Sequence, residues 1–323
     1  MAAGFGPERL SGRVTARRRA WRAVLVVATV AAVVVLARRL EAADLGERLR
    51  SAGPGWVLAT AVCSLVPLFG NVASMTALSP VRLPVVRTCV LWLATSFVNL
   101  VTPSSTGGVA LTVRYLQRRG LPLAVAVTTI GIVQSTSFVV TGLLVVVGLL
   151  GAGRSAESAV SVPWAVVGAG AVALATVLVV VRLHPRWRRW AVERVVEPVR
   201  AEWPALRRVL TQPGRVAVAV AGHLAVPLGF AATLWCAARA VGGHAPLLLL
   251  VLVVVGSSAV TAAVPVPGGI GASEAALTAG LVACGLTPEA ALSAALLHRA
   301  LTFWVRVPPA WVALLWLRRR GAV

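Results

Sequence analysis

The chain has 323 residues, of which 58% are hydrophobic and only 13% are charged, and this composition excludes an ordinary soluble fold. The formal net charge of +21 would suit a nucleic-acid-binding protein. All the basic residues are arginines, however, and they cluster at the ends of apolar runs, as they do in the cytoplasmic loops of membrane proteins. We therefore expect an all-α, polytopic integral membrane protein that binds no nucleic acid.

Eight apolar stretches follow one another along the chain, most of them long enough to cross a bilayer core. The first follows a basic tail at residues 1–22 and resembles a secretory signal, but Arg38 and Arg39 come directly after it and no clear cleavage site precedes them. We predict that it is retained and that residues 23–323 form a single transmembrane domain. The predicted segments are Trp21–Ala37, Trp56–Leu78, Val85–Val101, Leu121–Leu150, Val162–Val181, Val216–Ala238, Pro246–Val264 and Pro288–Leu317.

The arginines also predict how these segments cross the membrane. The N-terminal tail, the basic loop at about 182–215 and the C-terminal residues 318–320 are expected on the cytoplasmic side of a bacterial plasma membrane. Residues 82–119 carry arginines at both ends, so this stretch must enter the membrane and return to the same side. Residues 246–284 must do the same from outside. The sequence thus predicts about six full spans and two re-entrant or broken-helix hairpins.

The two predicted hairpins share a pattern that suggests an inverted internal repeat. The first reads VTPSSTGGVALTVRYLQRRGLP and the second VPVPGGIGASEAALTAGLVACGLTP, and both run from proline through a glycine pair and a short helix to glycine and proline. In transporters, broken helices at matching positions mark the substrate site. The free N–H groups at the start of a helix suit an anion, so two such ends facing one cavity could hold a phosphate.

Glu274 is the acidic residue that follows a glycine turn inside an apolar region. A carboxylate at membrane depth is unfavourable without a partner or a task, which favours a place in a substrate site. The alternative is a residue in the first turn of a helix that begins near Ala272, where the helix dipole favours negative charge. Both interpretations can hold at once.

Three arginines fall within membrane segments. Arg114 either binds a lipid phosphate or extends toward the nearby cytoplasmic surface. Arg299 lies deeper in its span, which favours a charge partner or a ligand-facing position. Arg306 precedes Pro308 and Pro309. It could simply donate to the carbonyl groups that these prolines leave without a hydrogen-bond donor.

The other reactive residues indicate no catalytic or metal site. The four cysteines and four histidines are scattered, without the spacing of a disulfide framework or a metal centre. Nucleotide-binding loops, serine elbows and paired carboxylates are also absent from the sequence. We expect no metal, no cofactor and no enzymatic activity. A membrane-embedded transferase would have to use Glu274 with His298 or Tyr115.

Two motifs in combination resemble the transmembrane flippase domain of lysylphosphatidylglycerol synthases and the stand-alone bacterial membrane proteins related to it. They are NLVTPSSTGG with a following RYLQRRG, and VPVPGGIGASEAALTAG with a following ALSAALLHRALTFW. The synthases' aminoacyl-transferase domain is not expected here, because apolar spans continue nearly to Val323. Val109 stands where this family often has an acidic residue. By resemblance, the substrate-binding residues are Asn99, Pro103, Gly107, Gly108, Arg114, Pro267, Gly268, Gly269, Gly271, Glu274 and Arg299.

The resemblance implies a protein that translocates an anionic envelope lipid or handles a lipid-linked intermediate. A non-catalytic membrane partner of an envelope-lipid enzyme is the alternative. The two hypotheses predict different structures. A transporter needs a cavity that joins the glycine turns to the lipid phase, whereas a partner protein needs a large apolar patch that its own helices leave unpacked.

Overall fold

The computed structural model describes residues 53–102, 106–152, 211–263 and 267–323, with single residues 200, 204 and 207. The chain divides into two compact units, Met1–Glu47 and Arg48–Val323, and every described residue belongs to the second unit. The predicted spans Trp21–Ala37 and Val162–Val181 lie outside the described residues, as do the N-terminal tail and most of the basic loop.

Within the described residues, four apolar helices are long enough to cross a membrane. The first is divided into α3 (Pro54–Cys63) and α4 (Val66–Leu78), and the second and third are α7 (Leu123–Ala152) and α12 (Pro213–Ala240). The fourth covers Pro288–Arg319. The described regular structure is entirely helical, and these helices coincide with four of the predicted full spans. The prediction of an all-α polytopic membrane protein is confirmed.

Two pairs of shorter helices form the segments that the sequence predicts as hairpins. The first hairpin consists of α5 (Val85–Val101, 17 residues) and α6 (Thr106–Gln117, 12 residues). The second hairpin consists of α13 (Leu247–Ala263, 17 residues) and α14 (Ala272–Ala283, 12 residues). At 1.5 Å per residue the 17-residue helices reach about 25 Å and the 12-residue helices about 18 Å, less than a bilayer core of about 30 Å. Within each hairpin the two helices pack against each other.

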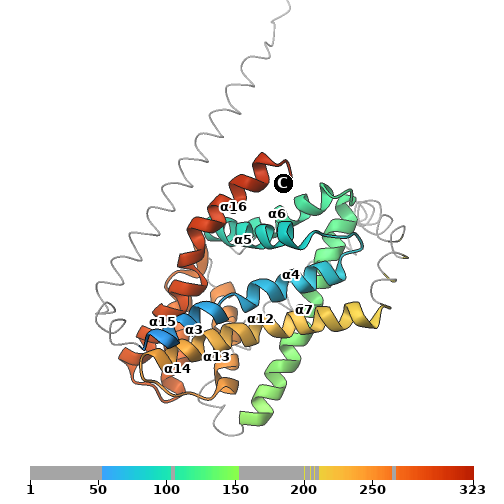
Figure 1. Cartoon of the computed structure of the whole chain (residues 1–323). Coiled ribbons are helices and arrows are strands. Elements are labelled where there is room, and N and C mark those ends of the chain that lie inside the picture. The colour runs from blue at the N-terminus through green and yellow to red at the C-terminus, as the bar shows by residue number, and fades with distance from the viewer. Residues whose placement is uncertain are drawn as a thin grey trace, which may run out of the picture. The chain divides into compact units, whose positions relative to one another are not determined.

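The open ends of the two hairpins lie at opposite ends of α7. The first hairpin continues directly into the start of α7 through residues 118–122. The beginning of α13 instead packs against the other end of α7, where a side chain on Gly148 or Gly151 would come within 2.9 Å of Leu252 or Leu248. These ends of α7 are about 42 Å apart at the rise of an α-helix. The hairpins therefore point in opposite directions. Figure 1 shows α5 and α6 near one end of α7.

The helices α4 and α12 cross at small residues. A Cβ atom on Gly70 would lie 2.6 Å from the carbonyl oxygen of Gly222, and a Cβ atom on Gly222 would overlap Ser74. Ser74 Oγ donates across this contact to the carbonyl oxygen of Ala219 at 3.1 Å. In a membrane, where apolar burial gives helices little reason to associate, such close backbone approach supplies the van der Waals contact that holds them together.

A buried core formed by α12, α13, α14 and α15 (Pro288–Thr302) holds the second hairpin in place. Leu234 on α12, Leu250 on α13 and Leu281 on α14 are completely buried there. The neighbouring residues of α15 are mainly alanines, including Ala291 and Ala294, which let the helix axes approach closely. This core fixes α15 against the hairpin and so determines where the polar residues at its end can lie.

The predicted span Pro288–Leu317 is interrupted. After α15 the backbone turns at Phe303, passes through the short 3₁₀ helix η5 (Trp304–Arg306) and continues as α16 (Val307–Arg319). Pro308 stands in the first turn of α16, where a missing N–H removes no helical hydrogen bond. The helix therefore breaks before the proline pair, and the interruption places η5 at the level of the polar residues described below.

The α4–α12 contact predicts a large effect for a small substitution. Gly222→Val should lower the free energy of unfolding by about 1–3 kcal/mol, because the new side chain collides with Ser74 and with the backbone of Gly70. Thermal unfolding of the purified protein in detergent measures this loss. Gly131→Val on α7 is the matched control, since an added Cβ there meets nothing within 4 Å. Equal melting temperatures for the two variants would contradict the proposed packing.

Candidate functional site

The tips of the two hairpins meet inside the protein. The second tip contains the 3₁₀ helix η4 (Pro267–Gly269), which packs against α5 near the end of the first hairpin. A side chain on Gly268 would lie 2.9 Å from Leu100 Cδ1 and 3.0 Å from Phe303 Cζ. The absence of a side chain at this position therefore lets the tip of one hairpin contact both the tip of the other and the break before η5.

At the first tip, polar side chains of α5 close the start of α6. Asn99 Oδ1 accepts a hydrogen bond from the Gly108 amide at 2.8 Å, and Thr102 Oγ1 accepts one from the Gly107 amide at 3.2 Å. Either glycine would need to move if it carried a Cβ, because that atom would overlap the same two side chains. The two amides are therefore satisfied within the protein. The sequence suggested that helix starts of this kind could hold a phosphate, but these two amides bind Asn99 and Thr102 instead.

At the second tip, Gly268, Gly269 and Gly271 adopt φ values of 65°, 62° and 90°, which residues with side chains rarely adopt. This left-handed backbone reverses the chain before α14. Glu274, in the first turn of α14, accepts a hydrogen bond from the Gly271 amide through Oε2 at 2.7 Å. Glu274 is therefore a helix-capping residue, as one of the two sequence interpretations proposed.

The other oxygen of Glu274 is paired with Arg299 from α15. The distance between Arg299 Nε and Glu274 Oε1 is 3.3 Å, and the two side chains are 12% and 4% exposed. Arg299 Nη2 also donates to the carbonyl oxygen of Gly268 at 2.9 Å, and its guanidinium lies 4.3 Å from the centre of the Phe303 ring. Arg299 thus connects α15 to both ends of the glycine turn, and Glu274 has a charge partner as well as a capping role.

A cavity of about 630 Å³ lies beside this ion pair. Arg299, His298 and Thr302 of α15 form one side of it, and Arg306 extends that side from η5. Glu274 is not among the lining residues: it is buried and paired with Arg299, which does line the cavity. The remaining walls come from both hairpins, α7 and α12, with the polar residues Ser96, Asn99, Thr102, Gln134, Ser257, Ser258, Thr261 and Ser273.

Most hydroxyl groups in the cavity donate their hydrogen to their own helix. Ser257 and Ser258 donate to the carbonyl oxygen of Val254 at 2.9 Å, and Thr261 donates to that of Ser257 at 2.7 Å. Thr302 and Ser96 are used in the same way. These oxygens can therefore offer only acceptor lone pairs to a ligand. The cationic donors of the cavity come from Arg299 and Arg306.

Arg306 and His298 each have a buried nitrogen without a hydrogen-bond partner among the described residues, namely Arg306 Nη2 and His298 Nδ1. The sequence analysis considered Arg306 only as a residue that satisfies carbonyls freed by Pro308 and Pro309, but it makes no such hydrogen bond in the described part of the chain. Its position inside an apolar span, directly before the break expected at Pro308 and Pro309, was the available signal for a place in the cavity.

The remaining predicted residues lie elsewhere. Arg114 is exposed in the last turn of α6 and does not line the cavity. Pro103 falls outside the described residues, and Pro267 begins η4. Tyr115 is completely buried, and its hydroxyl is 3.4 Å from Arg119 Nη2. The structure therefore brings Asn99, Gly268, Gly269 and Arg299 to the cavity wall and leaves Arg114 and Tyr115 away from it.

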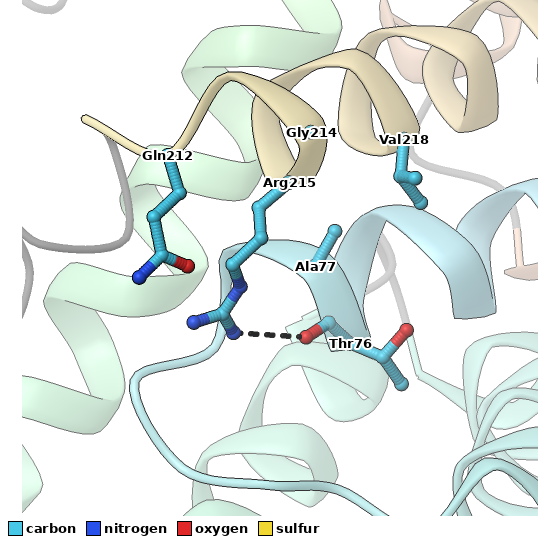
Figure 2. A pocket seen from close by; sticks show the side chains of 6 residues that line it. All are labelled: Thr76, Ala77, Gln212, Gly214, Arg215 and Val218. Atoms are coloured by element: carbon cyan, nitrogen blue, oxygen red, sulfur yellow. Dashed lines mark hydrogen bonds between the residues drawn. The ribbon is translucent and has the colours of Figure 1, made fainter.

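A second, more open pocket of about 430 Å³ lies where α12 begins. Figure 2 shows Arg215 reaching from α12 toward the end of α4. Its Nη2 donates to the carbonyl oxygens of Ser79 at 2.7 Å and Thr76 at 3.5 Å. A cation at the end of a helix stabilises the unpaired carbonyl groups there. Arg215 is thus engaged as a helix cap.

Comparison with known proteins points to one family. The family model described as "Lysylphosphatidylglycerol synthase TM region" matches residues 21–310 of the chain. This stretch includes both hairpins, every residue that lines the cavity and the ion pair. No curated protein matches the sequence.

The ion pair predicts a coupled effect on stability. Arg299→Gln should lower the free energy of unfolding by about 3 kcal/mol, because it leaves a buried carboxylate on Glu274 without its charge partner. The double variant Glu274→Gln/Arg299→Gln should lose less than the two single variants summed, since neither charge is then left alone. Thermal unfolding of all four proteins in detergent completes the cycle. Strict additivity would show that the two side chains do not interact.

Proposed function

Because the chain belongs to the lysylphosphatidylglycerol synthase transmembrane region family, a family of lipid-handling membrane proteins, we propose that it moves an anionic envelope lipid, or the head of a lipid-linked intermediate, across the bacterial plasma membrane. The observation that carries this proposal is the cavity where the two hairpin tips meet. A polar chamber inside so apolar a protein requires a polar ligand or water to solvate it. The proposal includes no chemical step, and both oxygens of Glu274 are already hydrogen-bonded.

The charge of the cavity supports an anionic ligand. Two arginines line it, and the acidic residue beside them, Glu274, is paired with one of them. The other described acidic residue, Glu289, is exposed in the first turn of α15. The described surroundings of the cavity therefore carry an excess of one positive charge. A phosphate group would neutralise it and accept the charge-assisted hydrogen bonds that guanidinium groups form best.

The edge of the cavity supports entry from the lipid phase. Gln134 and Phe138 of α7 and Ser258 and Ala262 of α13 line it and are exposed, Phe138 by 75%. The two helices touch at the far end of α7, but a Cβ atom on Gly142 of α7 or Gly256 of α13 would meet nothing within 4 Å. A side opening of this kind would admit a polar head while the acyl chains remain between the helices and the bilayer.

The opposed hairpins support a site that is reachable from either side. Their open ends lie at opposite ends of α7, and their tips meet at Gly268 and Leu100. We place the open end of the first hairpin, with α6, on the cytoplasmic side and that of the second hairpin outside, with both chain termini cytoplasmic. Small movements of one tip relative to the other would then expose the cavity alternately, as in transporters built on inverted hairpins.

Lipid movement tests the proposal directly. Proteoliposomes with fluorescent phosphatidylglycerol should lose more signal to an impermeant quencher than protein-free liposomes do. Glu274→Gln should abolish this gain, because glutamine can still cap Gly271 but carries no charge to hold Arg299. Arg118→Gln is the control, since Arg118 is exposed after α6 and water already solvates it.

Two results would contradict this account. Normal lipid movement by folded Glu274→Gln would leave Glu274 with its capping role alone. A wild-type protein that moves none of a panel of anionic lipids would instead favour the alternative of a non-catalytic partner of an envelope-lipid enzyme.

The opposed hairpins make a separate prediction about accessibility in intact cells. In a background without the four native cysteines, Gln117→Cys should resist an impermeant thiol reagent added outside, because the first hairpin returns to the cytoplasmic side. His244→Cys, just before the second hairpin, should react readily, and both positions are exposed in the structure. Rapid external labelling at residue 117 would place the first hairpin as a full crossing and refute the inverted arrangement.

A further inference from the structure

The two arginines of the cavity are in different situations. Arg299 is engaged on three sides, by Glu274 through Nε, by the carbonyl oxygen of Gly268 through Nη2 and by the face of the Phe303 ring. These contacts hold the glycine turn against α15. The Nε donor, one Nη2 donor and one face of the guanidinium of Arg299 are therefore used within the protein, although the residue lines the cavity.

Arg306 lines the same cavity, but its side chain forms no hydrogen bond or ion pair with any residue that the structure describes. Its Nη2 is buried without a partner. The two described acidic residues leave it uncompensated, because Glu274 is paired with Arg299 and Glu289 is exposed near the far end of α15. A half-buried guanidinium with a buried, unpartnered nitrogen is unfavourable until an anion reaches it.

His298 adds a second, independent observation at the same place. It is only 5% exposed, lines the cavity and has an unpartnered Nδ1. The hydroxyl groups nearby mostly donate to their own helices and cannot supply hydrogen to an anion. The cationic donors that line the cavity thus lie on the side formed by α15 and η5.

We propose that Arg306 binds the phosphate of the lipid head, whereas Arg299 is a positioning residue that holds the two hairpin tips and α15 together. This assignment rests on the proposed function. A planar guanidinium with two free N–H edges can hold a phosphate through paired hydrogen bonds, which a lysine cannot reproduce. It also predicts that the two arginines affect stability with opposite sign in the absence of lipid.

The test uses the purified full-length protein in phosphatidylcholine nanodiscs, with the melting temperature measured while phosphatidylglycerol is added. A ligand that binds only the folded state raises the melting temperature with concentration, so the titration reports apparent affinity. Wild type should respond to phosphatidylglycerol. Arg306→Gln should need about tenfold more of it or show no response. Arg306→Lys should fall between the two, because it keeps the charge but loses the paired geometry.

Stability without phosphatidylglycerol separates a ligand from a structural residue. Arg306→Gln should melt at or above the wild-type temperature, because it removes a half-buried charge that has no described partner. Arg299→Gln should melt lower, because it leaves Glu274 and the Gly268 carbonyl without their partner. Arg114→Gln is the matched control, since Arg114 is exposed outside the cavity, and it should resemble wild type in both measurements.

The contrary outcomes are distinct. If wild type responds to phosphatidylglycerol and both Arg306 variants respond equally well, the assignment of Arg306 is wrong while the proposed function stands. If wild type responds to no anionic lipid, the proposed function fails and this inference fails with it. An equal response to inorganic phosphate alone would overturn the assignment to a lipid head. A large loss of melting temperature in Arg306→Gln without lipid would show a structural role instead.

Discussion

The buried bridge from Glu274 through Arg299 to Gly268 is the interaction on which the site depends. The glycine turn has few side chains to pack and an unusual backbone, so it has little to hold it in one conformation. Glu274 fixes the end of the turn at Gly271, and Arg299 fixes its beginning and ties it to α15. Because the turn also contacts Leu100 of α5, a single ion pair positions both hairpin tips.

At both hairpin tips, side chains occupy backbone amides that an anion could otherwise use. Free amides at a helix N-terminus are a common anion-binding device. Here Asn99 and Thr102 occupy the amides of α6, and Glu274 occupies that of Gly271. The protein satisfies its own backbone at a depth where water is scarce, which a stable fold requires. Recognition of charge is left to side chains, and these can move without unfolding a helix.

Much of this architecture could be predicted from the sequence because its signals are local. Apolar length predicts the spans, and the glycine and proline pattern predicts the hairpins and the importance of Glu274. The position of Arg306 in the cavity was not predicted, because the nearby Pro308 offered a local reason for an arginine there. In the structure Pro308 lies in the first turn of α16, where it removes no helical hydrogen bond. For Arg114 the sequence left two interpretations open, a lipid-phosphate contact and extension toward the surface. Its spacing suited the site, but α6 places it at the exposed end of the helix.

The packing of α5 has a consequence for the order in which the protein is made. α5 lies against α16, more than 200 residues later in the chain. The first hairpin therefore emerges from the ribosome long before the helix that covers it, and its short helices end at a depth where bare backbone is unfavourable. Until α16 is made, α5 has only α4, α6 and other early helices to cover it. Completion of the C-terminus, rather than insertion of the early spans, then becomes the step that commits the protein to its fold.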